Sequence, residues 1–293
     1  MCTTVSDFKN SPKEAALSKL VEKPDYSWPS IGLFIYIMIS FSCSTVLAIN
    51  NSIPIFVAIL INALACYIAY TILHESAHGL ISKNKYINNA TGTLSLLFIT
   101  PMPFFSTYRF LHMTHHRFVN VPEKDPDYFC GAGPNWSLPF RWMLMDIAYV
   151  MNYFTMGFYS TRPKKEKIEF WVATTFGVCL LSYLFTMGYF YQFFLLYFIP
   201  TRIALFFLAI MFDYLPHYPH KVTVQEDKYK ATNNRIGLEW LLSPLFLGQN
   251  YHLSHHIYPN VPFYRYRKIW ECRKEFHNAN HAAEVKYYKL TSE

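Results

Sequence analysis

The chain has 293 residues, of which 52% are apolar, 19% are aromatic and only 15% are charged. Soluble globular proteins carry about 25% charged residues, so this composition excludes an ordinary soluble domain and predicts a membrane protein. The net charge of +7 suits an anionic membrane surface, and the absence of a basic patch laced with aromatic residues excludes nucleic acid as a partner.

The N-terminal part of the chain predicts a cytosolic arm over residues 1–30. It is polar, carries four lysines and contains no signal peptide, and a short helix is expected to begin at Pro12. The six cysteines are dispersed along the chain without a Cys-x-x-Cys pair. This spacing argues against a zinc ribbon, an iron–sulfur cluster and a disulfide scaffold.

Four apolar segments are long enough to cross a bilayer as helices. The first pair covers residues 31–49 and 53–73, and the second covers residues 170–189 and 192–212. At a rise of ~1.5 Å per residue, each can span most of the hydrocarbon core. An uncharged turn joins the members of each pair. We therefore predict an all-α integral membrane fold with four transmembrane helices in two hairpins.

The section between the two pairs, residues 79–167, is more polar. Residues 93–105 are apolar but short and interrupted by two prolines, which predicts a re-entrant or interfacial segment. Residues 108–118 are expected to be helical. Residues 138–160 are rich in aromatic side chains and are expected to lie along the membrane interface.

The distribution of Lys and Arg orients these segments. Of 26 such residues, 4 precede the first span, 10 lie between residues 80 and 167, and 11 follow residue 220, whereas both hairpin turns have none. The positive-inside rule then places both termini in the cytosol. We expect a membrane domain at residues 31–270, a cytosolic helical cap that carries the histidine motifs, and a cytosolic C-terminal tail at residues 271–293.

Ten of the twelve histidines lie in four clusters beside apolar segments. Three of the clusters have His-x-x-x-His or His-x-x-His-His spacing. Residues three and four apart share a face of a helix, so each of these motifs can direct its imidazoles the same way. The clustered residues are His74, His78, His112, His115, His116, His217, His220, His252, His255 and His256.

These clusters predict a metal centre at one membrane face. Neutral imidazole is a common ligand of iron, zinc and copper, and eight histidines in three motifs exceed the roughly four ligands of one tetrahedral zinc. Two metal ions are expected, and iron is favoured because it activates oxygen. Asp213, four residues before His217, is a candidate carboxylate ligand, although Pro216 disturbs a regular helix there. His220 can be a ligand, an outer residue or structural. His277 and His281 are expected to be solvated.

The three motifs, in this order, resemble the membrane fatty-acid desaturase and hydroxylase superfamily. Residues 123–127 after the second motif and residues 248–251 before the third strengthen the resemblance, which extends over residues ~30–270. It implies four spanning helices, use of O2 and two iron ions (Fe2+/Fe3+). The implied ligands are His74, His78, His112, His115, His116, Asp213, His217, His252, His255 and His256.

The resemblance also implies the reaction and its partners. The substrate is a lipid, either a fatty acyl chain or a carotenoid, and electrons come from an external ferredoxin or cytochrome b5 with its reductase. Fatty acyl desaturation is the predicted reaction, with hydroxylation of a carotenoid or other lipid as the alternative. Asp213 and His217 look like the Asn and His of stearoyl-type desaturases, with Asp replacing Asn, while residues 213–220 look more like the carotenoid hydroxylase branch.

Two other functions compete with this hypothesis. The first motif satisfies His-Glu-x-x-His, the signature of zinc metalloproteases, with Glu75 as general base. That alternative, an intramembrane protease, leaves the remaining clustered histidines unexplained. A metal transporter is the second alternative, but its histidines are expected to line a path through the bilayer. The final residues, 289–293, hold no retrieval signal, which favours a bacterial inner membrane over the endoplasmic reticulum.

Overall fold

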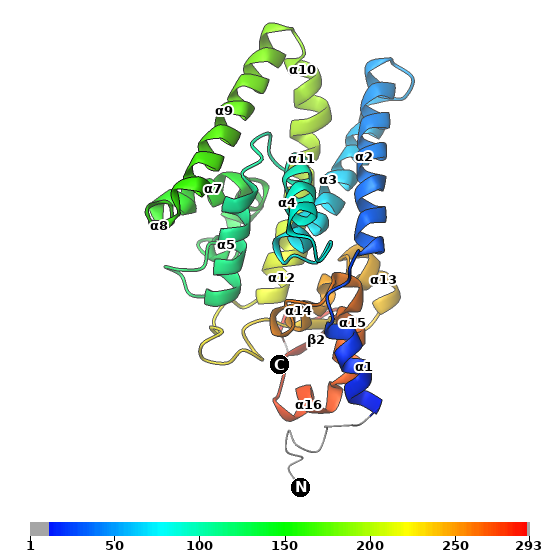
Figure 1. Cartoon of the computed structure of the whole chain (residues 1–293), viewed down its shortest axis with the longest axis vertical. Coiled ribbons are helices and arrows are strands. Elements are labelled where there is room, and N and C mark those ends of the chain that lie inside the picture. The colour runs from blue at the N-terminus through cyan, green and yellow to red at the C-terminus, as the bar shows by residue number, and fades with distance from the viewer. Residues whose placement is uncertain (1–11, 292–293) are drawn as a thin grey trace.

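The computed structural model describes residues 12–291, which are mostly helical. Four helical segments are long and apolar enough to cross a membrane: α2 (Trp28–Ile49), α3 (Ile55–Ala77), α9 (Lys164–Thr186) and a composite segment over Phe190–His217. The four predicted spans are thus confirmed as apolar helices, with ends that shift by a few residues. Figure 1 shows them projecting together from one end of the molecule.

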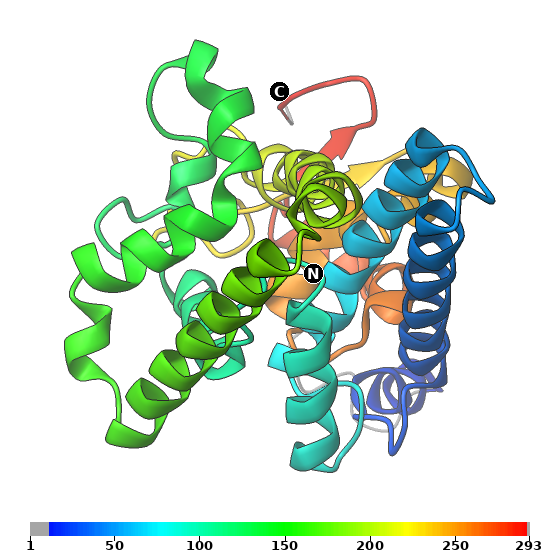
Figure 2. The same cartoon turned by 90° about the horizontal axis from the view of Figure 1, so that it is seen from above.

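The arrangement of the long helices leaves much apolar surface exposed. α2 buries only Ser30, Ile37, Ser44 and Ala48, and it packs mainly on α3. Seen from above, α2 lies outside α3, whereas α9 slants away on the other side of the composite segment (Figure 2). Such exposed apolar side chains are unfavourable in water and suit contact with lipid tails, as expected for membrane-spanning helices.

The composite segment combines α10 (Phe190–Phe193), α11 (Ile199–Leu208) and α12 (Leu215–His217) with two π-helical stretches, Phe194–Phe198 and Ala209–Tyr214. Each π-helical stretch lies just before a proline, Pro200 or Pro216. Proline lacks an N–H and crowds the carbonyl four residues earlier, so a widened turn lets the chain continue as a helix. The disturbance expected at Pro216 therefore changes the helix type without ending the segment.

The widened turn at Pro200 leaves a backbone carbonyl that a buried side chain satisfies. Asn62 of α3 donates from Nδ2 to the carbonyl oxygen of Leu196 at 2.7 Å and to Thr45 Oγ1 at 3.0 Å. Its Oδ1 also accepts a hydrogen bond from Ser44 of α2. Asn62 thus joins three of the four long segments at one point.

The section between α3 and α9 forms shorter helices. These are α4 (Lys85–Leu96), α5 (Phe105–Phe118), α6 (Leu138–Met143), α7 (Met145–Thr155) and α8 (Phe158–Thr161), with 3-10 turns at Tyr128–Cys130 and Asn135–Ser137. The predicted helix at residues 108–118 is confirmed and begins three residues earlier. Residues 93–105, expected as one segment, are divided between the end of α4 and its connection to α5.

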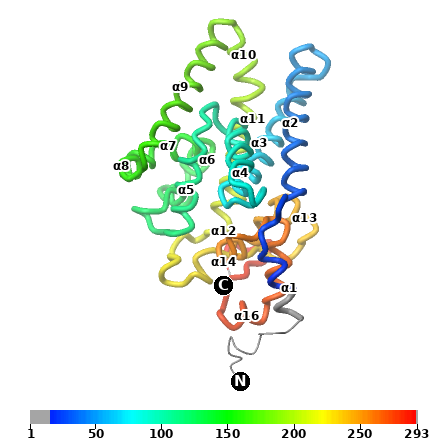
Figure 3. The backbone as a smooth tube through the Cα atoms, viewed as in Figure 1, coloured from blue at the N-terminus to red at the C-terminus, as the bar shows by residue number. Residues whose placement is uncertain are grey.

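The C-terminal segment, residues 218–291, gathers with α1 (Pro12–Val21) below the long helices (Figures 1 and 3). α1 begins at Pro12 as expected, while the rest of the predicted arm up to residue 11 and the last two residues of the tail lie outside the described residues. The segment holds α13 (Glu239–Leu245), α14 (His252–Ile257), α15 (Tyr266–Cys272), α16 (Lys274–Ala279) and 3-10 turns at Gln249–Tyr251 and Phe263–Arg265.

One small sheet departs from the all-α expectation. β1 (Asn234–Ile236) pairs in parallel with β2 (Glu284–Lys286), with Arg235 opposite Val285. Asn234 also forms two hydrogen bonds to Ser254 of α14. Its Nδ2 donates to Ser254 Oγ and its Oδ1 accepts from the Ser254 N–H, each at 3.1 Å. The end of the chain thereby supports the helix that carries the third histidine motif.

Apolar packing fixes the positions of the histidine motifs. Leu73, Leu111 and Leu253 adjoin His74, His112 and His252 in sequence, and each of these leucines is 1% exposed or less. Side chains in such a core have little freedom, since packing approaches that of an organic crystal. The imidazoles next to them are therefore held in defined directions.

The Asn62 contacts generate a prediction about stability. Replacing Asn62 with Leu leaves the Leu196 carbonyl unpaired within apolar surroundings, which costs about 1–2 kcal/mol. We expect a corresponding loss in equilibrium unfolding measured in mixed detergent and SDS micelles. Leu60→Ala, at an exposed position of the same helix, is the control. An Asn62→Leu protein as stable as the parent would contradict the assigned role.

Candidate metal centre

The histidine motifs converge from four separate elements. The first motif lies at the end of α3, the second in the last turns of α5, and the third in α14, while His217 ends the fourth long segment. Nine imidazoles form two groups whose ligand atoms lie within 4.8 Å of one another in each group. The five-histidine group is His74, His78, His112, His116 and His255, and the four-histidine group is His115, His217, His252 and His256.

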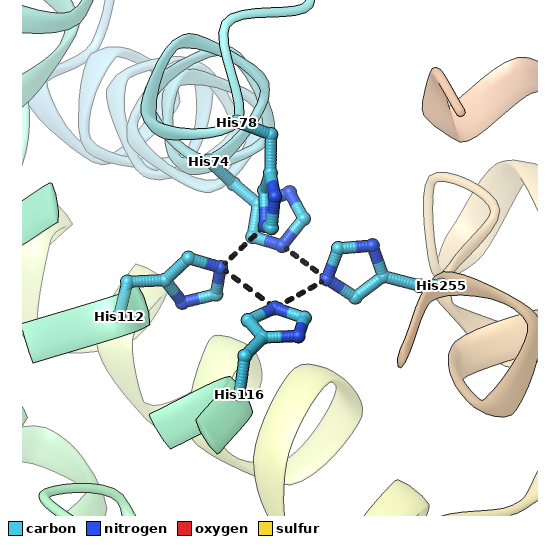
Figure 4. Close-up of side chains that lie close together, drawn as sticks. All are labelled: His74, His78, His112, His116 and His255. Atoms are coloured by element: carbon cyan, nitrogen blue, oxygen red, sulfur yellow. Dashed lines mark hydrogen bonds between the residues drawn. The ribbon is translucent and has the colours of Figure 1, made fainter. Parts of the chain in front are cut away.

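The five-histidine group is a ring of converging Nε2 atoms (Figure 4). His78 and His112 approach to 2.8 Å, His74 and His255 to 3.0 Å, and His116 lies 2.9 Å from His255 and 3.2 Å from His112. Four of the five side chains are buried, and His116 is half-buried. Unprotonated nitrogens directed at one point are the arrangement that a transition metal requires.

The four-histidine group adjoins the first. The Nε2 atoms of His252 and His256 are 2.9 Å apart, and the ring centroids of His115 and His217 are 4.8 Å apart. His217 Nε2 is buried and has no hydrogen-bond partner among the described residues. The rings of His116 and His256 stack with centroids 4.2 Å apart, so the two groups are direct neighbours.

The structure corrects the expectation that all members of a motif point the same way. In the second motif His112 and His116 enter the five-histidine group, whereas His115 enters the other. In the third motif His252 and His256 enter the four-histidine group, and His255 crosses to the five-histidine group. At ~100° per helix residue, residue i+4 is turned about 40° from residue i and residue i+3 about 60° in the opposite sense, so i and i+4 can enter one group while i+3 turns to the neighbouring group. Both motifs thus contribute to both groups.

The Nδ1 atoms determine which nitrogen faces each group. His115 lies 2.8 Å from Asp125 Oδ1, His217 lies 2.6 Å from the Asp213 carbonyl oxygen, and His252 lies 2.7 Å from Gln249 Oε1. His255 Nδ1 lies 2.8 Å from the Tyr266 hydroxyl. An Nδ1 proton donated to these acceptors leaves the Nε2 lone pair directed into the group. Together with the unpaired Nε2 of His217, this donor set fits bound metal ions.

Two buried carboxylates support His115. Asp125 accepts from His115 and from the backbone N–H groups of Asn120 and Asp127. Asp127 lies 3.5 Å from His115 Nδ1 and accepts a hydrogen bond from the Tyr149 hydroxyl. Their oxygens are already engaged, so we assign them to the support of His115 and not to a third metal site. Burial opposes a charge on His115, but Asp125 and Asp127 outweigh it and raise the pKa of His115 to about 10.

Six other histidines of the two groups lie outside the spanning segments and are neutral. Burial lowers the pKa well below the usual value at His78, His112, His116, His252, His255 and His256. Neutral imidazole keeps a lone pair for a metal at neutral pH. Metal binding by His115, in contrast, releases a proton from the ring.

Asp213 and His220 lie outside both groups. Asp213 Oδ2 accepts from Cys130 Sγ at 3.3 Å, and the residue reaches His217 through its backbone carbonyl. His220 has a left-handed φ of 60° and packs so tightly against Gly131 that a Cβ there would lie 2.3 Å from its ring. Its ring stacks on His217 with centroids 6.2 Å apart.

The expectation for the two remaining histidines is half right. His281 is exposed, but His277 is fully buried and stacks on Trp270 at a centroid distance of 4.1 Å. His277 Nε2 also approaches the Tyr258 hydroxyl at 3.4 Å. The polar residues around position 277 suggested exposure to solvent, but the His277 side chain packs in the core of the C-terminal segment.

Sequence reasoning did not identify the residues that support the histidines. Residues 123–127 supported only the resemblance, and nothing in the sequence predicted burial of their carboxylates, yet Asp125 and Asp127 are only 3% and 7% exposed. Gln249 lies three residues before His252, so its short spacing hinted at contact, whereas Tyr266 lies eleven residues after His255 and gave no such signal. Tyr266 also approaches Glu75 Oε1 at 3.4 Å, so it links the buried carboxylate of the first motif to His255.

An apolar cavity of about 40 Å³ lies beside the histidine groups. Its walls come from α3, α4, the connection between α4 and α5, and from α5, α7 and α11. They include Leu73 and Leu111, which directly precede His74 and His112. Tyr108 and Tyr149 stack along the cavity, and Tyr108 also stacks on His112 with centroids 5.9 Å apart. The cavity therefore begins next to the five-histidine group and extends between the long helices.

Comparison with known proteins places this centre in a family. Residues 51–287 match the family model described as Fatty acid desaturase. The chain belongs to the fatty acid desaturase family. Within the family, the chain is 26% identical over 230 residues to dihydrorhizobitoxine desaturase of Bradyrhizobium elkanii, a match that covers 70% of the chain but only 63% of that protein.

Beta-carotene ketolases of Paracoccus are similar at the same level. The protein of strain PC1 is 26% identical over 199 residues, which cover 67% of the chain and 71% of the ketolase, and that of a second strain matches equally well. The predicted resemblance to the histidine-motif superfamily is confirmed.

The contact between Tyr266 and His255 generates a prediction about metal affinity. Replacing Tyr266 with Phe removes the partner of His255 Nδ1, which is expected to weaken metal binding about 10–100-fold. Titration of the metal-free protein with Co2+ against a competing chelator measures this affinity. Tyr258→Phe removes a hydroxyl beside His277, outside both groups, and is expected to leave the affinity unchanged. Equal affinities in the two variants would refute the role of Tyr266.

Proposed function

We propose that this member of the fatty acid desaturase family is a membrane-bound, O2-dependent di-iron oxidoreductase that acts on an unactivated C–H bond of a lipid, with fatty acyl desaturation as its reaction. The two adjoining groups of five and four imidazoles support this proposal most directly. When bound, two iron ions (Fe2+/Fe3+) supply the activation of oxygen. The nine histidines are the proposed ligands, and Asp213 orients His217 through its backbone carbonyl.

The donor set favours two irons over one zinc. Tetrahedral zinc takes about four ligands, and nine converging imidazoles exceed that number. The neighbouring groups also share a stacked contact between His116 and His256, which brings two metal positions close together. Non-haem iron commonly uses imidazole ligands with oxygen as co-substrate. The chain itself holds the rings in the correct tautomer through Asp125, Gln249 and Tyr266.

A short part of a hydrocarbon chain is the proposed occupant of the apolar cavity, which is too small for a whole chain. Leu73, Leu111 and Val150 exclude water from it, and Tyr108 and Tyr149 hold the chain against the side of the five-histidine group. A desaturase and two ketolases among the relatives support oxidation of a C–H bond. Hydroxylation of a carotenoid or another lipid is the alternative, because the ketolase matches cover more of those relatives' length.

The contacts of Glu75 weigh against the zinc protease. A general base of that enzyme class has to reach a metal-bound water. Glu75 is fully buried, and its carboxylate accepts from the Phe263 N–H at 3.3 Å and from Tyr266 at 3.4 Å. It therefore lies behind the histidine ring, where it supports His255 through Tyr266.

The membrane arrangement is also part of the proposal. From the distribution of Lys and Arg, we propose that both termini and the histidine groups face the cytosol. We also propose that α2 and α3 form the first hairpin and that α9 and the composite segment form the second. Residues 31–270 are the proposed membrane domain, followed by the tail at residues 271–293. A ferredoxin, or cytochrome b5 with its reductase, supplies electrons, and a bacterial inner membrane is the proposed location.

The test is product analysis in cells that express the protein and are fed deuterated fatty acids. We expect gas chromatography and mass spectrometry to detect new alkenes in the extracted lipids. In His112→Ala we expect at least 90% of these alkenes to be lost, which corresponds to a rate lower by on the order of one decade. His281→Ala, at an exposed histidine, is expected to retain the product. New alcohols in place of alkenes would favour the hydroxylase. The di-iron proposal would be contradicted if protein purified from cells grown in iron-rich medium contained about one zinc and no iron.

A further inference from the structure

A line of tyrosine side chains leads away from the five-histidine group. Tyr108 of α5 stacks on His112, with the ring planes 3° apart and the centroids 5.9 Å apart. Tyr149 of α7 stacks on Tyr108 in turn, at 19° and 6.1 Å. Both tyrosines belong to the wall of the apolar cavity. Successive ring contacts thus join the proposed metal ligand His112 to Tyr149.

The line continues from Tyr149 to the outside of the molecule. Tyr153 lies one helical turn further along α7, where neighbouring Cβ atoms are about 5–6 Å apart. The rings of Tyr153 and Tyr159 then meet edge to face with centroids 5.7 Å apart. Trp171 of α9 donates from Nε1 to the Tyr159 hydroxyl at 3.0 Å, and its side chain is 51% exposed. Tyrosines and one tryptophan therefore connect the metal centre with the surface.

Packing alone does not explain why these residues are tyrosines. The hydroxyl oxygens of Tyr108 and Tyr153 are buried and have no hydrogen-bond partner within residues 12–291. An unpaired buried hydroxyl costs about 1–3 kcal/mol, a cost that Phe of nearly the same shape avoids. A phenol, however, gives up one electron much more readily than a phenyl ring. Tyrosine at these positions therefore indicates electron transfer.

Tyr149 differs from its neighbours because its hydroxyl has an acceptor. It donates a hydrogen bond to Asp127 Oδ1, while the other carboxylate oxygen of Asp127 lies 3.5 Å from His115 Nδ1. A phenol loses an electron most easily when its proton moves to an acceptor at the same time. Tyr108 and Tyr153 lack such an acceptor, so they pass an electron on without retaining the radical. Tyr149 is the position in the line where a radical is stabilised.

We propose that Tyr149 is a redox-active residue that reduces the oxidised metal centre when no lipid is bound. The inference rests on the proposed function, in which oxygen oxidises the bound irons. Tyr149 gives one electron to the centre through Tyr108, and its phenolic proton moves to Asp127. The O–H bond of Tyr149 is broken, a neutral tyrosyl radical remains, and the centre is reduced by one electron.

The outer part of the line restores Tyr149. A one-electron reductant in solution, such as ascorbate, supplies an electron at Trp171, which passes through Tyr159 and Tyr153 to the radical. The proton returns from Asp127 at the same step. The net result is transfer of one electron from the external reductant to the centre, with every side chain of the line left unchanged.

This activity protects the protein from its own oxidant. Without a lipid, an oxidised centre has only the surrounding side chains to oxidise, and the histidines that hold the metal are the nearest of them. Enzymes with reactive intermediates have to prevent such side reactions. Tyr108 and Tyr149 line the apolar cavity, so a bound chain occupies the same region and competes with them for the oxidant.

An inward path for electrons from the donor protein is a weaker explanation. A donor able to reduce iron works at a potential much too low to oxidise a phenol. It therefore needs neither a tyrosyl radical nor a carboxylate that accepts the phenolic proton. The hydrogen bond from Tyr149 to Asp127 favours the oxidative direction.

The test is electron paramagnetic resonance of the iron-loaded full chain in a detergent with a fluorinated tail, which offers no C–H bond as substrate. The reduced protein is mixed with oxygen and frozen at successive times. We expect a free-radical signal that narrows when the tyrosines carry ring deuterium, and Tyr149→Phe is expected to lose it. Tyr70→Phe is the matched control, since the Tyr70 ring also lines the cavity and lies 6.5 Å from His74.

Two further changes make the assignment specific. A ring-fluorinated tyrosine at position 149 retains the hydroxyl and is expected to add fluorine splitting to the signal, so the test holds even where Tyr149→Phe does not fold. With ascorbate present, Trp171→Phe is expected to lengthen the lifetime of the radical several-fold. Trp240→Phe, at an exposed tryptophan outside the line, is expected to leave the lifetime unchanged.

The outcomes separate this inference from the proposed function. Protein with two irons that oxidises lipid but forms no radical, or whose radical lacks the fluorine splitting or persists in Tyr149→Phe, overturns the inference alone. An unchanged lifetime in Trp171→Phe overturns the outward path. Slower reduction of the irons by ferredoxin in Tyr149→Phe, without a radical in the parent, assigns the line to the donor instead. Protein that binds no iron overturns both proposals.

Discussion

Burial of nine imidazole rings around two neighbouring points is the constraint on which the rest of the structure depends. Unpaired buried polar groups cost about 1–3 kcal/mol each, and here Nε2 atoms in the five-histidine group face one another at 2.8–3.2 Å. In this group His255 Nδ1 lies 2.8 Å from the Tyr266 hydroxyl, whereas the buried Nδ1 atoms of His74 and His112 have no hydrogen-bond partner among the described residues, so the group lacks partners for all its nitrogens. Metal ions bound at the inner nitrogens would satisfy their lone pairs together, which would couple metal binding to the stability of the fold.

The helix ends add a second, electrostatic reason for a cation at this place. α3, α5 and the composite segment all present their C-terminal turns to the histidine groups, and α14 does the same with His255 and His256. The C-terminal end of a helix carries the negative end of the macrodipole, which favours nearby cations. Helices that end beside one another thus favour a cation there by their direction, before any side chain is considered.

Sequence reasoning located the spans and all nine grouped histidines, because long apolar runs and His-x-x-His-His spacing are local signals. It missed how the histidines divide, since the exchange of His115 and His255 between groups depends on how α5 and α14 face each other across the fold. It also missed Asp125 and Asp127, whose charge suggested solvent, although hydrogen bonds from backbone N–H groups and His115 stabilise them when buried. Contacts between residues far apart in the sequence produce no periodic pattern in it, so they cannot be predicted from local spacing.

The division of the second and third motifs between the two histidine groups has a consequence for the chemistry. Because the second and third motifs each contribute to both groups, a displacement of α5 or α14 moves ligands of both metal positions together. Tyr108 extends this coupling to the apolar cavity, since it stacks on His112 and on Tyr149 of the opposite wall. In the proposed reaction, the same packed helices would set both the placement of a bound chain and the spacing of the metal positions. Whether one or two hydrogens are removed from neighbouring carbons would then depend on that shared geometry, and substitutions along the cavity wall are expected to change the outcome of the reaction through it.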